Sequence, residues 1–246
     1  MMSKDEIYAS DDADSRPFEF NENVARVFPD MLRRSIPGYD ASIEAIGWLA
    51  SRYVRTNTRC YDLGCSLGAA AEAIRDNVAE TGVQIVAVDS APAMVERCRQ
   101  RLAARGREDD PRPKVEVVAA DVREVAIDNA SMVVMNYTLQ FLPPGAREPM
   151  MRTIARGLNE GGVFFLSEKV VHEDEVIETL LVDLHHQYKR RNAYSELEIS
   201  RKRAALENVL IPERIETHRR RLAGAGFRHV GVLLQYLNFI SLVATR

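Results

Sequence analysis

The chain has 246 residues, of which 46% are hydrophobic and 28% are charged. This composition excludes a wholly disordered, collagen-like or low-complexity protein and suits one α/β domain with a sizeable insertion. No run of about 18 apolar residues occurs, so we expect no transmembrane helix. The first residues lack a basic start followed by an apolar stretch, so we expect no secretory signal and a cytoplasmic protein.

Charge is distributed unevenly along the chain. The net charge is −3, yet residues 187–246 hold 12 Lys and Arg against 5 Asp and Glu. This basic quarter can meet an anion, such as a carboxylate substrate, a nucleic acid or an acidic partner, although such charge runs usually form a solvated helix surface. The cysteines, Cys60, Cys65 and Cys98, form no CxxC pair, which favours reduced thiols over disulfides or a zinc site.

The order of the predicted elements indicates an α/β fold. An acidic, mobile arm over residues 1–20 and a short helical entry broken at Pro29 precede a helix over 41–54. Strands are then predicted over 60–63, 84–89, 115–121, 130–136 and 162–167, with helices over 69–80, 92–105 and 146–158. This alternation predicts a doubly wound, parallel, Rossmann-like sheet with helices on both faces.

A helical insertion interrupts the alternation after the fifth strand. Apolar residues at helical spacing run from Val176 to Leu184, and further helices are predicted over 195–208 and 212–224, before strands over 230–235 and 240–244. We expect a helical cap over the carboxyl edge of the sheet. The chain then divides into residues 1–40, an arm and entry helix, and residues 41–246, a cofactor-binding domain that includes the insertion 173–224.

The most informative motif is Asp62-Leu63-Gly64-Cys65-Ser66-Leu67-Gly68, directly after a predicted strand. A glycine at this place lets the backbone turn sharply and approach a ligand closely. The motif lacks the GxGxxG pattern of nicotinamide-binding loops and matches the D-x-G-x-x-x-G form typical of S-adenosylmethionine sites. Its G-x-S-x-G string also resembles a hydrolase nucleophile elbow, but no convincing Asp and His follow at later strand ends.

Polar side chains end the next three predicted strands. Asp89, 27 residues after Asp62, can accept two ribose hydroxyls or cap the following helix. Asp121 can accept a hydrogen bond from an adenine amino group, or it can cap a loop. Asn136 can face the crevice where a substrate meets the cofactor, or serve in a turn.

Arg203 differs from the other basic residues of the predicted helix 195–208. At helical spacing it shares a face with Ile199 and Leu206, whereas the two basic residues before it point elsewhere. An unpaired buried charge is costly, so we expect Arg203 to be buried against an anion. That anion is either a ligand or one of two glutamates of the same helix region, Glu207 and Glu196.

The histidines indicate no metal site. His185 and His186 are adjacent on a predicted helix and point about 100° apart, and the other histidines are scattered.

Six segments tie the chain to one known family. They are Arg34–Tyr39, Tyr61–Ala70, Asn129–Asn136, Leu139–Leu142, Leu166–Lys169 and Tyr194–Ser200. Through them the chain resembles, from about residue 5 to its end, the carboxy-S-adenosyl-L-methionine synthases of the class I methyltransferase superfamily. The last segment is the most specific, because ordinary class I methyltransferases lack it.

The resemblance implies an enzyme that converts S-adenosylmethionine and prephenate to carboxy-S-adenosylmethionine and phenylpyruvate, without a metal. The sulfonium methyl group loses a proton, and the resulting ylide captures the carbon dioxide that leaves prephenate. The product then serves a tRNA carboxymethyltransferase in wobble-uridine (cmo5U) modification, so no direct contact with nucleic acid or membrane is implied. Members of the family are homodimers.

The family's ligand contacts carry over residue by residue. They fall on Tyr39, Gly64, Cys65, Ser66, Asp89, Ser90, Asp121, Val122, Asn136 and Arg203. The arginine that matches Arg203 reaches the partner's site, which makes Arg203 the implied catalytic residue. The chain departs from the family's sequence pattern at two positions, and both changes are conservative. Ser90 stands where some relatives have Asn, and Tyr137 stands where some have Phe.

Two other functions share parts of this pattern. An ordinary methyltransferase acting on a small molecule or RNA would use the same loop and release S-adenosylhomocysteine. A non-catalytic tRNA-binding partner would use the basic C-terminal quarter and bind in a salt-dependent manner, but the chain lacks the aromatic-rich basic stretches of an RNA-binding module. No strong side-chain base is evident, which favours a base generated from the substrate.

Overall fold

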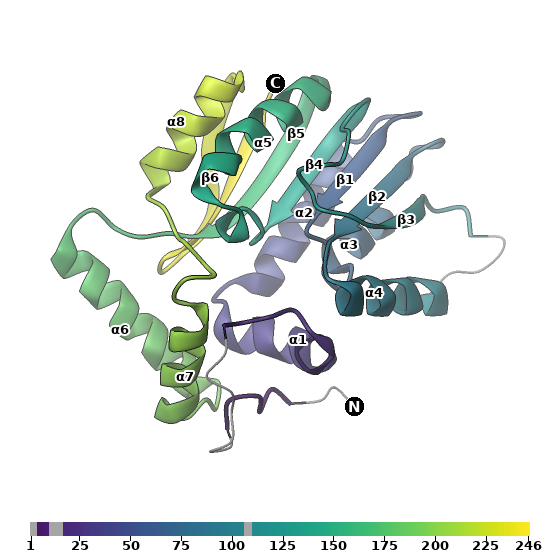
Figure 1. Ribbon diagram of the computed structural model, residues 1–246. Coiled ribbons are helices and arrows are strands. Elements are labelled where there is room, and N and C mark those ends of the chain that lie inside the picture. Colours follow the sequence, from purple (N-terminus) through teal and green to yellow (C-terminus); the bar gives the residue numbers. More distant parts are fainter. Residues whose placement is uncertain (1–3, 10–16, 106–109) are drawn as a thin grey trace.

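A sheet forms the centre of the computed structural model, which describes residues 4–9, 17–105 and 110–246. Within these residues the sheet has seven strands in the order β3-β2-β1-β4-β5-β7-β6 (Figure 1). The strands are β1 (Arg59–Leu63), β2 (Gln84–Asp89), β3 (Lys114–Ala119), β4 (Ala130–Asn136), β5 (Leu158–Lys169), β6 (His229–Tyr236) and β7 (Phe239–Thr245). The predicted doubly wound fold is confirmed, and β1 to β5 pair in parallel.

The last two strands depart from the predicted parallel sheet. β7 pairs antiparallel with both β5 and β6. Only Leu237 and Asn238 separate β6 from β7, and so short a connection can join only antiparallel neighbours.

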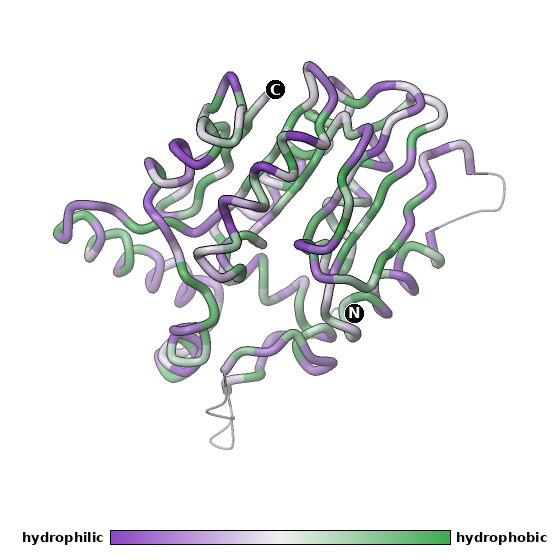
Figure 2. Tube along the Cα trace, turned by 45° about the horizontal axis from the view of Figure 1, so that its top comes forward, coloured by the Kyte–Doolittle hydropathy of each residue, from purple (hydrophilic) through white to green (hydrophobic). Residues whose placement is uncertain are grey.

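Helices cover both faces of the sheet. The helices α2 (Tyr39–Tyr53), α3 (Ala69–Asn77) and α4 (Pro92–Arg105) pack on one face, and α5 (Pro144–Gly157) and α8 (Ile215–Ala225) on the other. The central strands are almost wholly buried, and Figure 2 shows them as largely hydrophobic. Successive residues of a strand enter opposite cores, as Cys60 and Tyr61 do.

The first helix, α1 (Glu22–Ser35), is continuous, so the expected break at Pro29 is wrong. Proline lacks an N–H group and leaves the Ala25 carbonyl without its usual helical partner, which is costly in a helix interior. The apolar face that includes Phe28 and Met31 is buried against the rest of the molecule. This burial keeps α1 helical through the proline.

The expected mobile arm is packed in place where the structure describes it; residues 1–3 and 10–16 lie outside the described residues. Asp5, Tyr8 and Phe18 are each less than a tenth exposed. The Phe18 N–H group donates to the Ala205 carbonyl at 2.9 Å. The arm therefore joins the same apolar cluster as α1.

The cap is smaller than the sequence predicted. The helices α6 (Glu175–Arg191) and α7 (Glu196–Leu206) lie at the carboxyl edge of the sheet, with α1 beside them (Figure 1). By contrast, α8 packs against α5 and β6, and its Leu222 is fully buried in the sheet core. The apolar side of α8 covers the sheet, so that helix belongs to the α/β layers. No helix in the described ranges is both long and apolar enough to span a membrane.

Candidate functional site

A cavity of about 950 Å³ lies at the carboxyl edge of the sheet, enclosed by α1, α6 and α7. It is lined by every residue that the resemblance assigned to ligand binding: Tyr39, Gly64, Cys65, Ser66, Asp89, Ser90, Asp121, Val122, Asn136 and Arg203. These residues follow the ends of β1 to β4 or stand on α2 and α7. The fold thus gathers residues from distant parts of the sequence around one space.

The motif loop, residues 64–68 after β1, contains two glycines with positive φ angles, and a side chain at the first of them would collide with a neighbouring residue. Gly64 and Cys65 both donate their N–H groups to the Val88 carbonyl, at 2.8 and 2.9 Å. Gly64 has φ +82°, and a Cβ atom there would lie 2.3 Å from the side chain of Thr138. Gly68, with φ +81°, begins α3. The loop therefore passes close to the opposite wall of the cavity in a backbone conformation that favours glycine.

Asp62 stands at the base of this loop. Its side chain lines the cavity, although the residue is only 1% exposed, and its Oδ2 atom accepts from the Ala71 N–H group at 3.0 Å. Burial raises the pKa of this carboxyl to about 7, against the lowering effect of the Ala71 hydrogen bond. The group therefore changes protonation close to neutral pH.

We expect the stability of the protein to fall as pH rises from about 4 to about 7 because of Asp62. In this range the folded chain retains a proton on Asp62 that the unfolded chain has released. The free energy of unfolding is therefore higher at pH 4 than at pH 7 by about a few kcal/mol. Asp62→Asn imitates the neutral carboxyl and should flatten this slope. Chemical denaturation of both proteins across the pH range measures it, and parallel curves would contradict the assignment.

Asp89 connects the motif loop to the second strand. Its Oδ2 atom accepts from the Ser66 N–H group at 2.8 Å, and its Oδ1 atom accepts from the Ala91 N–H group at 2.9 Å. Burial raises the pKa of the carboxyl above its ordinary value. A carboxylate has about four acceptor positions, so the capping contact leaves room for the expected contacts to ribose hydroxyls.

The next part of the cavity wall combines one acid with an apolar surface. Asp121 accepts from Arg123, with the Nε atom 2.9 Å from Oδ1, and hydrogen bonds from that side chain lower the pKa of the carboxyl. Val122 is buried in the sheet core, and Ser90 is exposed. These residues suit a flat ring with a polar edge, the kind of group that adenine presents.

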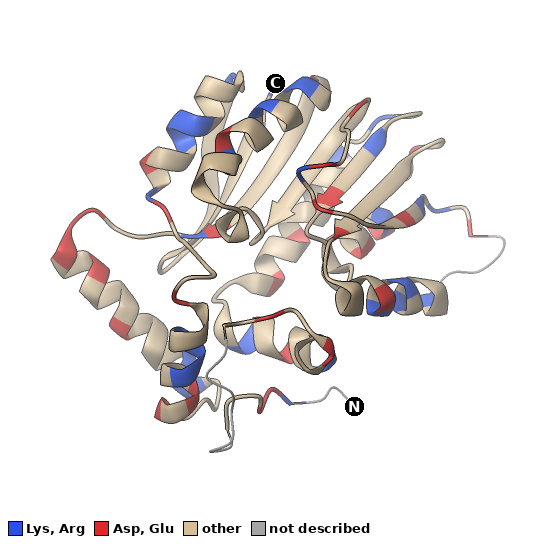
Figure 3. Cartoon of the chain, viewed as in Figure 1, with Lys and Arg blue, Asp and Glu red and all other residues tan. Residues whose placement is uncertain are grey.

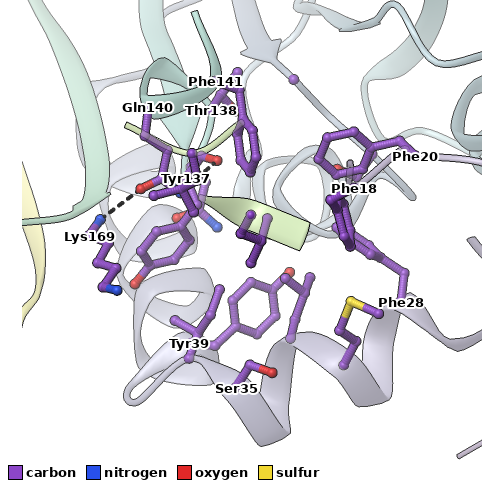
Figure 4. Close-up of a pocket in the computed structure, with 18 of the residues that line it drawn as sticks. Phe18, Phe20, Phe28, Ser35, Tyr39, Tyr137, Thr138, Gln140, Phe141 and Lys169 are labelled. Carbon is purple, nitrogen blue, oxygen red and sulfur yellow. Dashed lines mark hydrogen bonds between the residues drawn. The ribbon is translucent and has the colours of Figure 1, made fainter. Parts of the chain in front are cut away.

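Asn136 and two tyrosines form the wall nearest to β4. The Asn136 Oδ1 atom is buried and has no hydrogen-bond partner among the described residues, which marks it as an acceptor available to a ligand. The ring centroids of Tyr39 and Tyr137 lie 6.5 Å apart (Figure 4). Tyr137 has φ +61°, a strained conformation for a large side chain, of the kind that clusters at functional sites.

A group of phenylalanines forms the opposite side of the cavity, and the sequence analysis missed it. Phe18, Phe20 and Phe28 lie together in Figure 4, and Phe20 also contacts Phe141 at 5.3 Å between ring centroids. The two phenylalanines of the N-terminal arm, in an otherwise polar segment, were the available signal. These rings give this side of the cavity an apolar surface.

The expected burial of Arg203 is wrong. Arg203 is exposed at the cavity, whereas Lys202 is only 5% exposed. The buried stripe of α7 runs through Ile199, Lys202 and Ala205, at steps of three residues, so Arg203 lies on its flank. The proposed alternative partner Glu196 pairs with Arg190 instead. Arg203 therefore faces the cavity without a described ion-pair partner.

Two further lysines, Lys169 and Lys189, line the same end of the cavity, together with His185 and His186. The His185 Nε2 atom lies 2.8 Å from the Ser35 carbonyl oxygen, and burial lowers the pKa of this histidine to about 3. In the described ranges no group of three or more His, Cys, Asp and Glu residues is placed to hold a metal ion. Acids predominate in the cavity beside β1 to β3, where Arg123 pairs with Asp121, and form its acidic end. Basic residues predominate beside β5, α6 and α7, where Glu178 and Glu207 also line the cavity, and form its basic end.

Known proteins of three kinds resemble this chain. The methyltransferase domain family matches residues 60–162. The carboxy-S-adenosyl-L-methionine synthase of Klebsiella pneumoniae is 49% identical over all of this chain and 98% of its own length, and that of Mannheimia succiniciproducens is 50% identical over the full length of both chains. A solved methyltransferase structure from Methanococcus maripaludis shares the fold, with a TM-score of 0.61, 18% identity and coverage of 94% and 95% of the two chains. The chain therefore belongs to the carboxy-S-adenosyl-L-methionine synthase family of enzymes.

Proposed function

We propose that this enzyme converts S-adenosylmethionine and prephenate to carboxy-S-adenosylmethionine and phenylpyruvate. The observation that carries the proposal is the division of one cavity into an acidic end and a basic end. A cationic sulfonium nucleoside and a dianionic carboxyl donor have complementary charges to these two ends. The full-length similarity to enzymes of this name supports the same reaction.

The acidic end suits the nucleoside. Asp89 has acceptor capacity left for the two ribose hydroxyls, and Asp121 lies where an adenine amino group can donate to it. Asp62 and the unpaired Asn136 Oδ1 atom remain for the cationic methionyl part.

The basic end suits the carboxyl groups. When prephenate loses its ring carboxylate as carbon dioxide and its ring hydroxide, the remaining ring becomes aromatic. The released hydroxide takes a proton from the sulfonium methyl group, and the ylide carbon attacks the carbon dioxide. Arg203 holds the new carboxylate with its planar guanidinium. No side-chain base is needed, because the substrate supplies it.

The aromatic walls serve the same chemistry. An ylide in contact with water would be protonated faster than it could react with carbon dioxide. Phe18, Phe20 and Phe141 on one side and Tyr39 and Tyr137 on the other narrow the space between the two ends of the cavity. Phe18, Tyr39 and Tyr137 are buried and Phe20 and Phe141 are half-buried, which supports a reaction with little contact with bulk water.

We infer further that the enzyme is a cytoplasmic homodimer whose product is consumed by a tRNA carboxymethyltransferase in wobble-uridine modification. The full-length similarity to carboxy-S-adenosyl-L-methionine synthases supports this inference.

Mass spectrometry of the reaction tests the proposed function. Purified protein incubated with S-adenosylmethionine should form a nucleoside that carries one additional carboxyl group only when prephenate is present. Phenylpyruvate should accumulate in equal amount. The matched control omits prephenate or replaces it with phenylpyruvate. If S-adenosylhomocysteine were the main product, the ordinary methyltransferase function would replace this one.

A further inference from the structure

Two lysines at the basic end of the cavity have no hydrogen-bond or ion-pair partner among the described residues. Lys169 ends β5, and its backbone N–H group donates to the Gln140 Oε1 atom at 3.0 Å, which fixes the strand end beside the short helix η1 (Leu139–Phe141) (Figure 4). Lys189 projects from α6 and is 8% exposed. Among the described residues neither ammonium group makes a hydrogen bond or an ion pair, and both line the cavity.

The neighbouring Lys202 is a buried lysine whose ammonium group does have partners within the protein. Its Nζ atom donates to the Ser35 Oγ atom at 2.9 Å and lies 3.5 Å from the Asp5 Oδ2 atom. It also lies 5.2 Å from the ring centroid of Tyr194. Lys202 is thus satisfied within the protein, in contrast to Lys169 and Lys189.

The surroundings of Lys169 and Lys189 are rich in basic residues. Arg203 and Lys202 line the same part of the cavity, and Figure 3 shows basic residues on α7. His185 and His186 also line it, but burial lowers the pKa of both histidines. Burial and the repulsion of Lys202, Lys169 and Arg203 lower the pKa of Lys189 to about 7.

Glu178 is the acid that faces this group from α6. Its Oε2 atom accepts from the His172 N–H group at 2.7 Å, and its negative charge partly opposes the lowering of the Lys169 pKa by burial and by Arg203. Basic residues outnumber Glu178 and Glu207 in this part of the cavity. An excess of positive charge in a partly buried site is unfavourable, and an anionic ligand relieves this cost.

We propose that Lys169 and Lys189 form a second anion subsite that holds the carboxylate which the donor retains after transfer. The inference rests on the proposed function, in which Arg203 holds the carboxylate that is transferred. The donor class is then a 2-oxo acid with a second, departing carboxyl group. The two subsites select dianions, and a monocarboxylate donor leaves one of them empty.

Binding of phenylpyruvate, the retained part of the donor, tests the subsite without turnover. Calorimetry on enzyme loaded with S-adenosylhomocysteine should give a Kd that is about tenfold or more weaker in Lys169→Met and in Lys189→Met, because each loses a charge-assisted contact. The affinity for S-adenosylhomocysteine should stay within about twofold, because that ligand lies at the acidic end. In turnover assays the KM for prephenate should rise by a factor similar to that of the phenylpyruvate Kd.

Methionine has about the length of lysine, and removing a buried, unpaired charge does not endanger the fold. Arg191→Met is the matched control: it removes a positive charge from an exposed residue of α6 outside the cavity and should change neither constant. Unchanged phenylpyruvate binding in both lysine variants, or no binding by the unaltered enzyme, would overturn the subsite. If the enzyme formed no carboxylated product while phenylpyruvate binding still depended on the lysines, the proposed function would fail and the anion subsite would stand.

Discussion

Asp89→Ala is expected to weaken the binding of S-adenosylmethionine by about a hundredfold or more. The carboxylate is proposed to accept from two ribose hydroxyls, and two charge-assisted hydrogen bonds contribute roughly 3 kcal/mol or more. Its loss also releases the N–H groups of Ser66 and Ala91, which loosens the motif loop. Isothermal titration calorimetry on the folded variant measures the loss.

A second acid provides the control for Asp89. Asp128 precedes β4, at the opposite edge of the sheet, where it pairs with Arg59 and accepts from the Tyr61 hydroxyl at 3.0 Å. Asp128→Ala therefore removes an acid with comparable contacts outside the cavity and should leave the Kd unchanged. Equal affinity of Asp89→Ala and the unaltered enzyme would show that the carboxylate serves the loop alone.

The sheet and the loop after its first strand were predictable because local patterns decide them. The run from Asp62 to Gly68 contains two glycines that the fold needs at positive φ, and the apolar strands around it are buried on both faces. Strands of this kind are recognised from short apolar runs with turn residues at their ends. The acids at the ends of β2 and β3 could be assigned to the cavity because parallel strands end at one edge.

Features that depend on distant parts of the chain escaped the sequence analysis. The continuity of α1 through Pro29 depends on burial by the N-terminal arm and α7. The assignment of α8 to the cap failed because α6 and α8 are both amphipathic, and only tertiary contacts distinguish a cap helix from a sheet-covering helix. Helical periodicity shows that a helix buries one face and does not show against what.

The basic residues of α7 illustrate the same limit. Periodicity placed Arg203 on the apolar stripe, yet Lys202 is the buried residue, since Asp5, Ser35 and Tyr194 surround it. Asp5 stands almost 200 positions away in the sequence. A local sequence pattern therefore cannot reveal the partner that makes burial of a lysine tolerable. That distant partner decides that Lys202 is buried and the adjacent Arg203 is not.

Arg203→Ala and Arg203→Lys are both expected to cripple the formation of carboxy-S-adenosylmethionine while leaving the fold intact. Arg203 is exposed and forms no ion pair with the described residues, so its removal leaves no buried group unsatisfied. Lysine keeps the charge and loses the planar fork that binds a carboxylate at two points. Product formation measured by mass spectrometry, with the melting temperature as control for folding, tests both variants.

If the enzyme is the proposed homodimer, mixed dimers decide whether Arg203 acts in the site of its own subunit or in the site of the partner subunit. Arg203→Ala subunits are combined with Gly64→Val subunits, whose loop is blocked because a side chain at Gly64 would collide with Thr138. If the arginine reaches the partner's site, each mixed dimer holds one intact site, and random mixing should restore about a quarter of the activity. Arg203 also lines the cavity of its own chain, and an arginine acting there would restore none. Full inactivity of dimers that demonstrably mix would therefore exclude a shared site and assign the carboxylate contact to the same chain.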